Sequence, residues 1–349
     1  MRKTKRMNTG WIVTILTLLV MLTVTACGKS SNNNNGEQAA TSKPAQASEV
    51  ADNGSGNKSY KIAYVAGITT DAFYISMKFG AEEVAKKLGV NLIWTGAPEW
   101  DYTKQTPIVE SLIAEKVDAI IIAPNDSKAM IAPLKKAMNA GIPVFTVDTN
   151  VDDGSAYYAN VTSDNEQGGK LGADTLANLI GKKGKIAVMG PKPGISTTDA
   201  RQKGFLEQIK NYPDIEVVAT EYCDDQATEA AKKIQDILLA NSDLAGVFAT
   251  NVNSGAGVSQ GLRVKNAAGT VKLVSYDAGP EQVKALKAGE LQAIVSQKPL
   301  EEARIVLQSA FDYLEGKKDV QKETTLDNVS VTPENIDQDE VKMWLYRTK

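Results

Sequence analysis

Short runs of apolar and β-branched residues recur along most of this chain, and they constrain its fold more than any other feature. The runs end at polar residues and alternate with segments in which apolar residues recur at helical spacing. Continuous apolar runs are typical of strands that are buried on both faces of a parallel sheet. The alternation therefore predicts right-handed βαβ units and an α/β architecture.

The predicted strands form two sets, separated by a break at 161–164. The first set is 61–65, 91–94, 119–122 and 144–147, and the second is 185–189, 215–218, 246–249, 271–275 and 293–295. Helices are expected over 72–88, 103–116, 129–140, 168–180, 200–211, 228–240 and 301–314. Two similar sets predict two similar lobes, each a small doubly wound parallel sheet.

The start of the chain has the pattern of an export signal. Basic residues within 1–6 precede an apolar run over 11–24, which is short for a membrane span. The next residues, 24–27, resemble the lipobox of bacterial lipoproteins. This resemblance implies a signal peptide at 1–26, lipidation of Cys27 and a location on the outer face of the cell membrane, in a Gram-positive cell. The alternative is an ordinary signal peptide, or a weak span, with an incidental cysteine.

Residues 27–58 are rich in Asn, Ser, Ala and Gly. Such a segment buries too little apolar surface to offset its loss of conformational entropy on ordering. We therefore expect a flexible tether between the lipid anchor and the folded body.

Several kinds of chemistry are excluded by the residue types that the chain lacks. It has no histidine, which removes histidine-based triads and the commonest zinc ligand. Its second cysteine, Cys223, has no partner for a disulfide if Cys27 is lipidated. Basic and acidic residues are interspersed and the net charge is −3, so we expect no nucleic-acid partner. No metal or cofactor is expected.

Polar and aromatic residues follow the ends of the predicted strands in both sets. Ligands of open parallel sheets bind outside the carboxyl ends of the strands. Carboxylates, amides, one guanidinium and aromatic rings together suit a polyhydroxylated ligand, because each hydroxyl both donates and accepts hydrogen bonds. The same aspartates could instead cap helices or form turns, and the rings could belong to the core.

Several segments, in order along the chain, carry a family resemblance. They are 72–81, 118–126, 140–148, 162–169, 201–205, 274–277 and 331–336. From about 60 to 331 the chain resembles the periplasmic sugar-binding proteins of the ribose-binding type, which are solute receptors of ABC importers. The resemblance implies a first lobe at 60–163 plus 298–325 and a second at 164–297 plus 326–345. Three crossovers, near 163, 297 and 326, would form a hinge that closes on the ligand.

The resemblance also implies a set of ligand-binding residues. These are Asp71, Phe73, Tyr74, Asp148, Arg201, Asn251, Asp277 and Gln297. Ribose binders usually have arginine where this chain has Thr149, and a second stacking aromatic residue near Asp224 and Asp225. These departures favour a hexose, a cyclitol or another polyol over ribose, with Thr149, Asp224 and Asp225 as further candidates. A membrane permease is the implied partner, and we expect a monomer that is not an enzyme.

Three rival functions have some support in the sequence. Gly255, Gly257 and Gly261 precede Asp277 by about 20 residues, as in a dinucleotide site, but 250–254 separate them from the preceding strand. Close helix packing explains these glycines better. A glycosidase could use Asp148 and Asp277 as its carboxylate pair. A sensor subunit would differ from a transport receptor only in its membrane partner. A repressor core of the same fold is disfavoured by the export signal.

Overall fold

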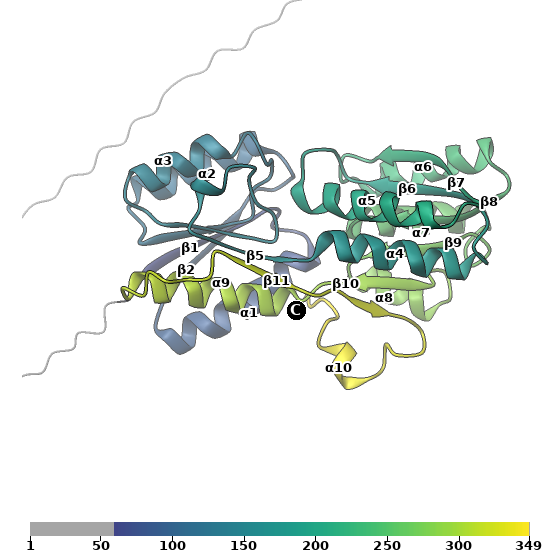
Figure 1. The fold of residues 1–349 in the computed structure, drawn as a ribbon. Helices are drawn as coiled ribbons and strands as arrows, with labels where there is room; N and C mark the ends of the chain where they lie inside the picture. Colours follow the sequence, from purple (N-terminus) through teal and green to yellow (C-terminus); the bar gives the residue numbers. More distant parts are fainter. Residues whose placement is uncertain (1–58, 349) are drawn as a thin grey trace, which may run out of the picture. The chain divides into compact units, whose positions relative to one another are not determined.

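Two six-stranded sheets organise the computed structural model, which describes residues 59–348 (Figure 1). The first sheet has the order β11-β5-β4-β3-β1-β2, and its strand pairs are all parallel. Its strands are β1 (Lys61–Ala66), β2 (Asn91–Gly96), β3 (Ala119–Ile122), β4 (Val144–Val147), β5 (Ala159–Ser163) and β11 (Glu323–Leu326).

The second sheet repeats the topology of the first. Its order is β12-β10-β9-β8-β6-β7, and only β12 runs antiparallel to its neighbour. The strands are β6 (Gly184–Gly190), β7 (Ile215–Tyr222), β8 (Leu244–Ala249), β9 (Lys272–Tyr276), β10 (Ala293–Ser296) and β12 (Val329–Val331). The predicted fold class, two similar α/β lobes with parallel sheets, is confirmed.

Helices cover both faces of each sheet (Figure 1). In the first lobe, α1 (Ala72–Leu88) packs with α9 (Pro299–Leu314) on one face, and α2 (Tyr102–Ala114) packs with α3 (Ile131–Asn139) on the other. In the second lobe, α4 (Asn165–Leu179) packs with α5 (Ser196–Gln208) on one face. The other face carries α6 (Ala227–Ala240), α7 (Val252–Val264) and α8 (Pro280–Lys287).

The chain passes between the lobes three times. It leaves the first sheet after Ser163, returns between Ser296 and α9, and leaves again between Leu326 and Val329. The short helix α10 (Asp339–Lys342) follows β12. The last strand and the last helix therefore follow the third crossing.

The central strands show why the sequence pattern is so clear. Every residue of β3 is fully buried. Ile121 packs in the core beneath α1 and α9, whereas Ile120 and Ile122 pack in the core beneath α2 and α3. Because successive side chains of a strand point to opposite faces, a strand covered on both sides must be apolar throughout.

Strand β5 differs from the expected break at 161–164. Three of its five residues are polar, and Asn160 pairs with both neighbouring strands: Thr146 Oγ1 donates to Asn160 Oδ1 (3.0 Å), and Asn160 Nδ2 donates to Glu323 Oε2 (2.9 Å). Asn160 is 2% exposed. A buried strand that satisfies its polar side chains in this way has no apolar run to reveal it.

The glycines of the dinucleotide-like run serve helix packing. A Cβ atom at Gly257 would collide with the Ala227 carbonyl oxygen of α6, and one at Gly255 would collide with Ser275 Oγ of β9. All three glycines lie on α7, so they allow this helix to approach its neighbours closely. The run is explained without a nucleotide.

Among residues 59–348, none of the helices is long and apolar enough to cross a bilayer. Within the same range, no group of three or more Cys, Asp or Glu side chains is arranged to hold a metal ion. The predicted signal at 1–26, the lipidated Cys27 and the tether at 27–58 lie outside the described residues.

Candidate functional site

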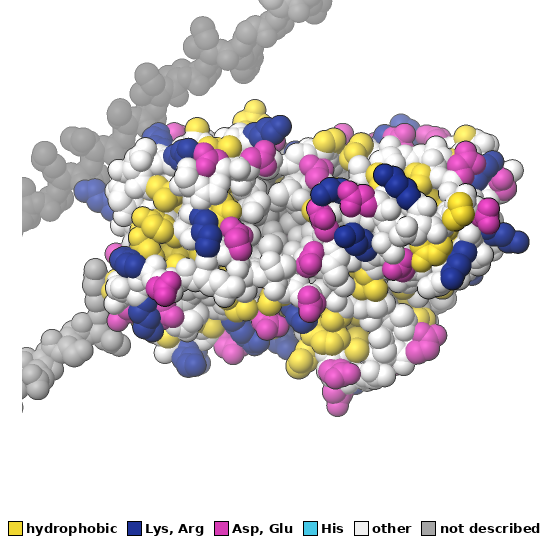
Figure 2. Space-filling view, in the orientation of Figure 1, with side chains coloured by type: hydrophobic (Ala, Val, Ile, Leu, Met, Phe, Trp, Pro, Cys, Tyr) yellow, Lys and Arg dark blue, Asp and Glu magenta, His cyan; other side chains and the backbone are white. Residues whose placement is uncertain are grey.

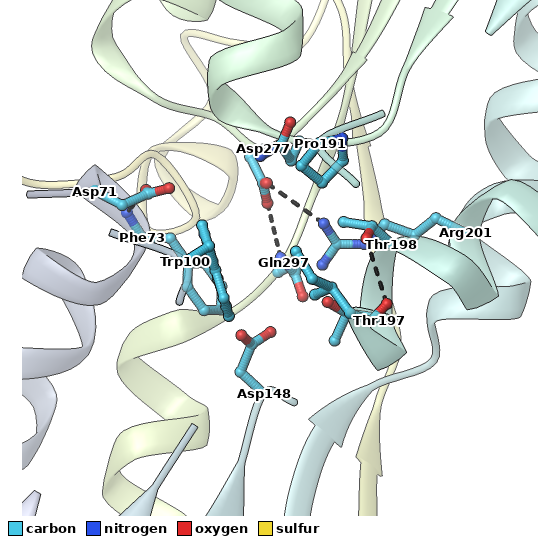
Figure 3. A pocket seen from close by; sticks show the side chains of 12 residues that line it. Asp71, Phe73, Trp100, Asp148, Pro191, Thr197, Thr198, Arg201, Asp277 and Gln297 are labelled. Atoms are coloured by element: carbon cyan, nitrogen blue, oxygen red, sulfur yellow. Dashed lines mark hydrogen bonds and ion pairs between the residues drawn. The ribbon is translucent and has the colours of Figure 1, made fainter. Parts of the chain in front are cut away.

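A cavity lies between the two lobes, at the carboxyl ends of their strands (Figure 3). Its lining residues come from both lobes: Asp71, Phe73, Trp100, Asp148, Pro191, Ile195, Thr197, Thr198, Arg201, Asn251, Asp277 and Gln297. Carboxylate, guanidinium, amide and aromatic side chains of the two lobes therefore meet in one place.

Asp148 enters the cavity from the end of β4. Its φ is 60°, and its backbone N–H donates to the Val161 carbonyl of β5 (2.8 Å). Tyr74 Oη donates to Asp148 Oδ2 (2.5 Å), so this tyrosine supports the carboxylate from behind. Burial raises the pKa of Asp148 to about 6, although Arg201 and the Tyr74 hydrogen bond act in the opposite direction.

Asp277 takes the corresponding place at the end of β9. Its Oδ2 lies 3.5 Å from Arg201 Nη1, and its Oδ1 accepts a hydrogen bond from Gln297 Nε2 (2.7 Å) (Figure 3). The Oε1 atom of Gln297 is buried and has no hydrogen-bond partner within residues 59–348. A buried acceptor that faces a cavity is an available partner for a ligand donor.

Arg201 is held rigidly by the second lobe. Its Nε donates to Asn165 Oδ1 (2.8 Å), and its Nη1 donates to the Thr250 carbonyl (2.9 Å). The guanidinium carbon lies 3.9 Å from the centroid of the Tyr276 ring, and the residue is 3% exposed. Because these contacts come from the protein itself, ligand binding does not have to immobilise the guanidinium.

Asp71 caps α1 and also lines the cavity. Its Oδ1 accepts a hydrogen bond from the Phe73 N–H (2.8 Å), so one side chain both caps the helix and lines the cavity. Burial raises the pKa of Asp71 to about 8, and the charges of Asp277, Asp225 and Asp148 raise it further. A carboxyl whose pKa is raised holds its proton to higher pH than a free aspartate, and the protonated form can donate a hydrogen bond.

Aromatic rings form one side of the cavity. Phe73 is 4% exposed and meets the Tyr74 ring edge-to-face at 5.2 Å between centroids. Trp100 lies 6.0 Å from the Tyr74 ring and faces the carboxylates (Figure 3). Such rings offer the apolar surface on which the C–H face of a sugar packs.

The structure brings together most of the residues that the sequence nominates. Seven line the cavity: Asp71, Phe73, Asp148, Arg201, Asn251, Asp277 and Gln297. Tyr74 lies directly behind Asp148. Asp225 is 6% exposed and accepts a hydrogen bond from Asn251 Nδ2 (2.7 Å), and burial raises its pKa to about 6. Asn251 also caps α7.

Two nominated residues differ from the expectation. Thr149 is fully buried, and its hydroxyl donates to the Pro124 carbonyl (2.9 Å) rather than facing the cavity. Asp224 is exposed, whereas its neighbour Asp225 is buried. Both residues lie in a turn with positive φ (49° and 58°), only Asp225 pairs with Asn251, and neither is among the residues that line the cavity.

Sequence reasoning missed five lining residues. Trp100 follows β2, and the others lie in the loop after β6 or on the first turn of α5: Pro191, Ile195, Thr197 and Thr198. Both segments follow the carboxyl ends of strands, which is the signal that could have identified them.

The lobes contact one another beside the cavity. The Ser127 N–H donates to the Gly194 carbonyl (3.2 Å), and the Asn150 N–H donates to Ser196 Oγ (3.0 Å). Lys192 Nζ donates to the Trp100 carbonyl. These contacts join opposite lips of the cavity, so the lobes are in a closed arrangement. Two α/β lobes that close on a polar cavity define a binding protein for small solutes.

A family model described as a periplasmic binding protein domain matches residues 62–318. The chain is 33% identical over 272 residues to the ribose import binding protein of Bacillus subtilis (strain 168), covering 77% of this chain and 86% of that protein. The chain therefore belongs to the periplasmic binding protein family, and the expected family is confirmed.

Solved structures agree with this assignment. An ABC transporter solute-binding protein from Agrobacterium vitis, bound with alpha-D-tagatopyranose, has a TM-score of 0.81 and 37% identity, and covers 83% of this chain and 100% of its own. A second solute-binding protein from Agrobacterium vitis, with bound D-fucose, has a TM-score of 0.79 and 29% identity. The match covers 82% of this chain and 100% of that protein. Both neighbours hold a monosaccharide.

Proposed function

We propose that this chain is an extracytoplasmic receptor that captures a monosaccharide or polyol between its two lobes and delivers it to an ABC-type importer. The observation that carries the proposal is the composition of the inter-lobe cavity. Carboxylates, two amides, a guanidinium and two aromatic rings converge there from both lobes. Hydroxyl groups pair with the polar groups, and the apolar face of the ring packs on Phe73 or Trp100.

The ligand class follows from the polar groups. Arg201 is the only guanidinium among the lining residues, and Thr149 points away from the cavity. Ribose binders usually place an arginine at the position of Thr149, so this site has one fixed donor group fewer. Protonated Asp71 offers a replacement donor at a different point. A hexose, a cyclitol or another polyol is the proposed ligand, and the structural neighbours bind tagatose and fucose.

Delivery rests on the closed arrangement of the lobes. A ligand that bridges both lobes shifts the equilibrium toward the closed form, because only that form completes its contacts. The closed form is the one that a permease would recognise. Basic and acidic side chains are interspersed over the face in Figure 2, so no patch of a single sign dominates it. We propose that the protein acts as a monomer without catalytic activity, tethered to the outer face of a Gram-positive membrane by lipid on Cys27.

The first experiment is a thermal-shift screen of purified protein over aldoses, ketoses and cyclitols. A true ligand raises the melting temperature by mass action, and isothermal calorimetry then measures its affinity. Absence of any shift across the three classes, followed by absence of calorimetric binding, would overturn the proposal.

A second experiment separates the receptor from the glycosidase. The bound sugar, and a panel of its glycosides, are incubated with the protein and analysed by nuclear magnetic resonance. A receptor releases every compound unchanged. Hydrolysis that is lost in the Asp148→Asn variant would instead identify a carboxylate-based enzyme.

A further inference from the structure

The end of the chain links the two lobes in addition to the three crossings. Residues 344–347, here called the C-terminal strap, follow α10. In the second lobe, Ser296 Oγ donates to the Trp344 carbonyl (2.9 Å), and the Tyr346 N–H donates to the Ala278 carbonyl (3.0 Å). The strap then reaches α1 of the first lobe, and Figure 1 places the end of the chain beside this helix.

The contact with α1 uses the backbone of the strap. The Arg347 N–H donates to Ser76 Oγ (2.7 Å), and Ser76 Oγ donates to the Arg347 carbonyl (3.2 Å). Ser76 is fully buried. A buried hydroxyl that is paired in both directions loses both partners if the strap detaches, so this link stabilises the contact between the lobes.

Tyr346 extends from the strap to the back of the candidate site. Its hydroxyl donates a hydrogen bond to Asp277 Oδ1 (2.7 Å). The same oxygen accepts a hydrogen bond from the backbone N–H of Gln297, with 3.4 Å between the nitrogen and the oxygen. Its ring meets the Phe73 ring of the first lobe at 5.6 Å between centroids. The side chain is 6% exposed and is not among the residues that line the cavity.

These contacts define what Tyr346 does. Asp277 Oδ1 accepts from both Gln297 and Tyr346, which leaves Oδ2 directed at Arg201. Burial raises the pKa of Tyr346 well above its usual value, and Asp277 raises it further, so the phenol remains a donor. The hydroxyl therefore fixes the orientation of the carboxylate, while the ring couples that orientation to the position of the first lobe.

We propose that the C-terminal strap is a fourth link between the lobes that holds the closed state, and that Tyr346 is a positioning residue for Asp277 and Gln297. The proposal rests on the proposed function, because it assumes that the cavity binds a sugar. Opening the lobes breaks the Ser76–Arg347 bonds and the Phe73–Tyr346 contact, since these join residues of different lobes. Losing them lowers the closed population and weakens the apparent affinity in proportion.

The test uses two variants and a matched control in the full chain. Tyr346→Phe removes the hydroxyl and keeps the ring, and Ser76→Ala removes the link to α1. Arg347→Ala is the control, because both of its bonds to Ser76 come from the backbone. Affinity, association rate and dissociation rate are measured with the sugar found in the thermal-shift screen. The melting temperature is measured without sugar.

We expect Tyr346→Phe and Ser76→Ala to bind about 10-fold more weakly, through faster dissociation at an unchanged association rate. Their melting temperatures without sugar should stay within about 5 °C of the parent protein. Arg347→Ala should match the parent in every measurement. Affinities and dissociation rates of both variants within twofold of the parent would overturn the proposal.

Hydrogen exchange tests the strap independently of any sugar. In the ligand-free protein, Ser76→Ala should accelerate amide exchange in the peptide that contains residues 344–347, and Arg347→Ala should not. If the parent protein binds no sugar, the proposed function fails, and the exchange result still decides the strap. Unchanged exchange in Ser76→Ala would refute the strap as a link between the lobes.

Discussion

Asp148 and Asp277 occupy equivalent positions in the two lobes and share the same unusual backbone conformation. Asp148 follows β4 with a φ of 60°, and Asp277 follows β9 with a φ of 74°. Each donates its N–H across to the next strand, to Val161 and Val295, at 2.8 Å in both cases. A non-glycine residue with positive φ is costly, and the repetition of that cost at one cavity indicates a functional constraint.

The equivalence explains how two lobes make one site. The left-handed turn lies at the end of each strand, and both carboxylates line the cavity between the lobes. Arg201 then lies within reach of Asp277 and lowers the pKa of Asp148. A closed arrangement without this guanidinium would bring buried carboxylates together with no compensating charge, which is strongly unfavourable.

The first prediction concerns Asp148. The Asp148→Asn variant should bind the sugar about 10- to 100-fold more weakly, because a charge-assisted hydrogen bond contributes about 1.5–3 kcal/mol. Its melting temperature without ligand should not fall, since the substitution removes a buried charge and retains an oxygen for Tyr74. Calorimetry and thermal unfolding measure the two quantities.

A matched control is the neighbouring residue. Thr149→Ser keeps the hydroxyl that donates to Pro124 and changes nothing that lines the cavity. Its affinity should stay within twofold of the parent protein. Equal losses in Asp148→Asn and Thr149→Ser would show that this loop acts by general packing and not by contact with the ligand.

The second prediction is a loss of stability with rising pH. Asp71 has a pKa of about 8 in the folded chain, against about 3.9 when unfolded. Between these values the folded state holds a proton that the unfolded state has lost, so the free energy of unfolding falls as the pH rises, until Asp71 ionises near pH 8. Burial also raises the pKa of Glu302 to about 8, and this residue adds to the same slope.

Urea denaturation at pH 5, 7 and 9 tests this dependence. The asparagine of Asp71→Asn cannot ionise and can still cap the helix. The free energy of unfolding of this variant should therefore fall less steeply with rising pH than that of the parent. Asp224→Asn changes an exposed residue, so its free energy of unfolding should depend on pH in the same way as that of the parent. If the stability of Asp71→Asn had the same pH dependence as that of the parent, this would contradict the raised pKa of the Asp71 carboxyl.

The third prediction is a fluorescence signal at Trp100. Because its ring lines the cavity, a bound sugar displaces water from it and changes its emission. The Trp100→Phe variant should lose most of the ligand-induced change. Trp94→Phe should keep it, because Trp94 stacks on Tyr64 (4.7 Å between centroids) and does not line the cavity. A full signal in Trp100→Phe would place the ligand elsewhere.

The fourth prediction concerns lipidation. Cells that express Cys27→Ser should not incorporate labelled palmitate into the protein, and the chain should be released or remain unprocessed. Cys223→Ser should be labelled like the parent, because Cys223 is 1% exposed and raised in pKa by burial, which leaves its thiol unreactive. Retention of label in Cys27→Ser would refute the anchor.

The amino-acid sequence by itself determined the fold class and most of the site. Buried parallel strands must be apolar throughout, so β3 and β4 are visible as runs, and the polar residues that follow such runs converge at one edge of the sheet. This pattern marked the strand ends where Asp71, Asp148 and Asp277 lie, and the family resemblance then implied these three residues as ligand contacts. Strand β5 was not predicted because it has no apolar run. Its buried Asn160 is instead paired with Thr146 and with Glu323, which lies 163 residues further along the chain.

Only the tertiary structure decided which side chains face the cavity and what supports them. Asp224 and Asp225 are equivalent in sequence, and their difference comes from Asn251, 26 residues later, which pairs with Asp225 alone. Tyr346 lies 69 residues from Asp277 along the chain, in a segment whose sequence has no periodic pattern. Local periodicity reports which face of an element is buried. The partner of a given oxygen is set by how distant segments pack, and no local pattern encodes that.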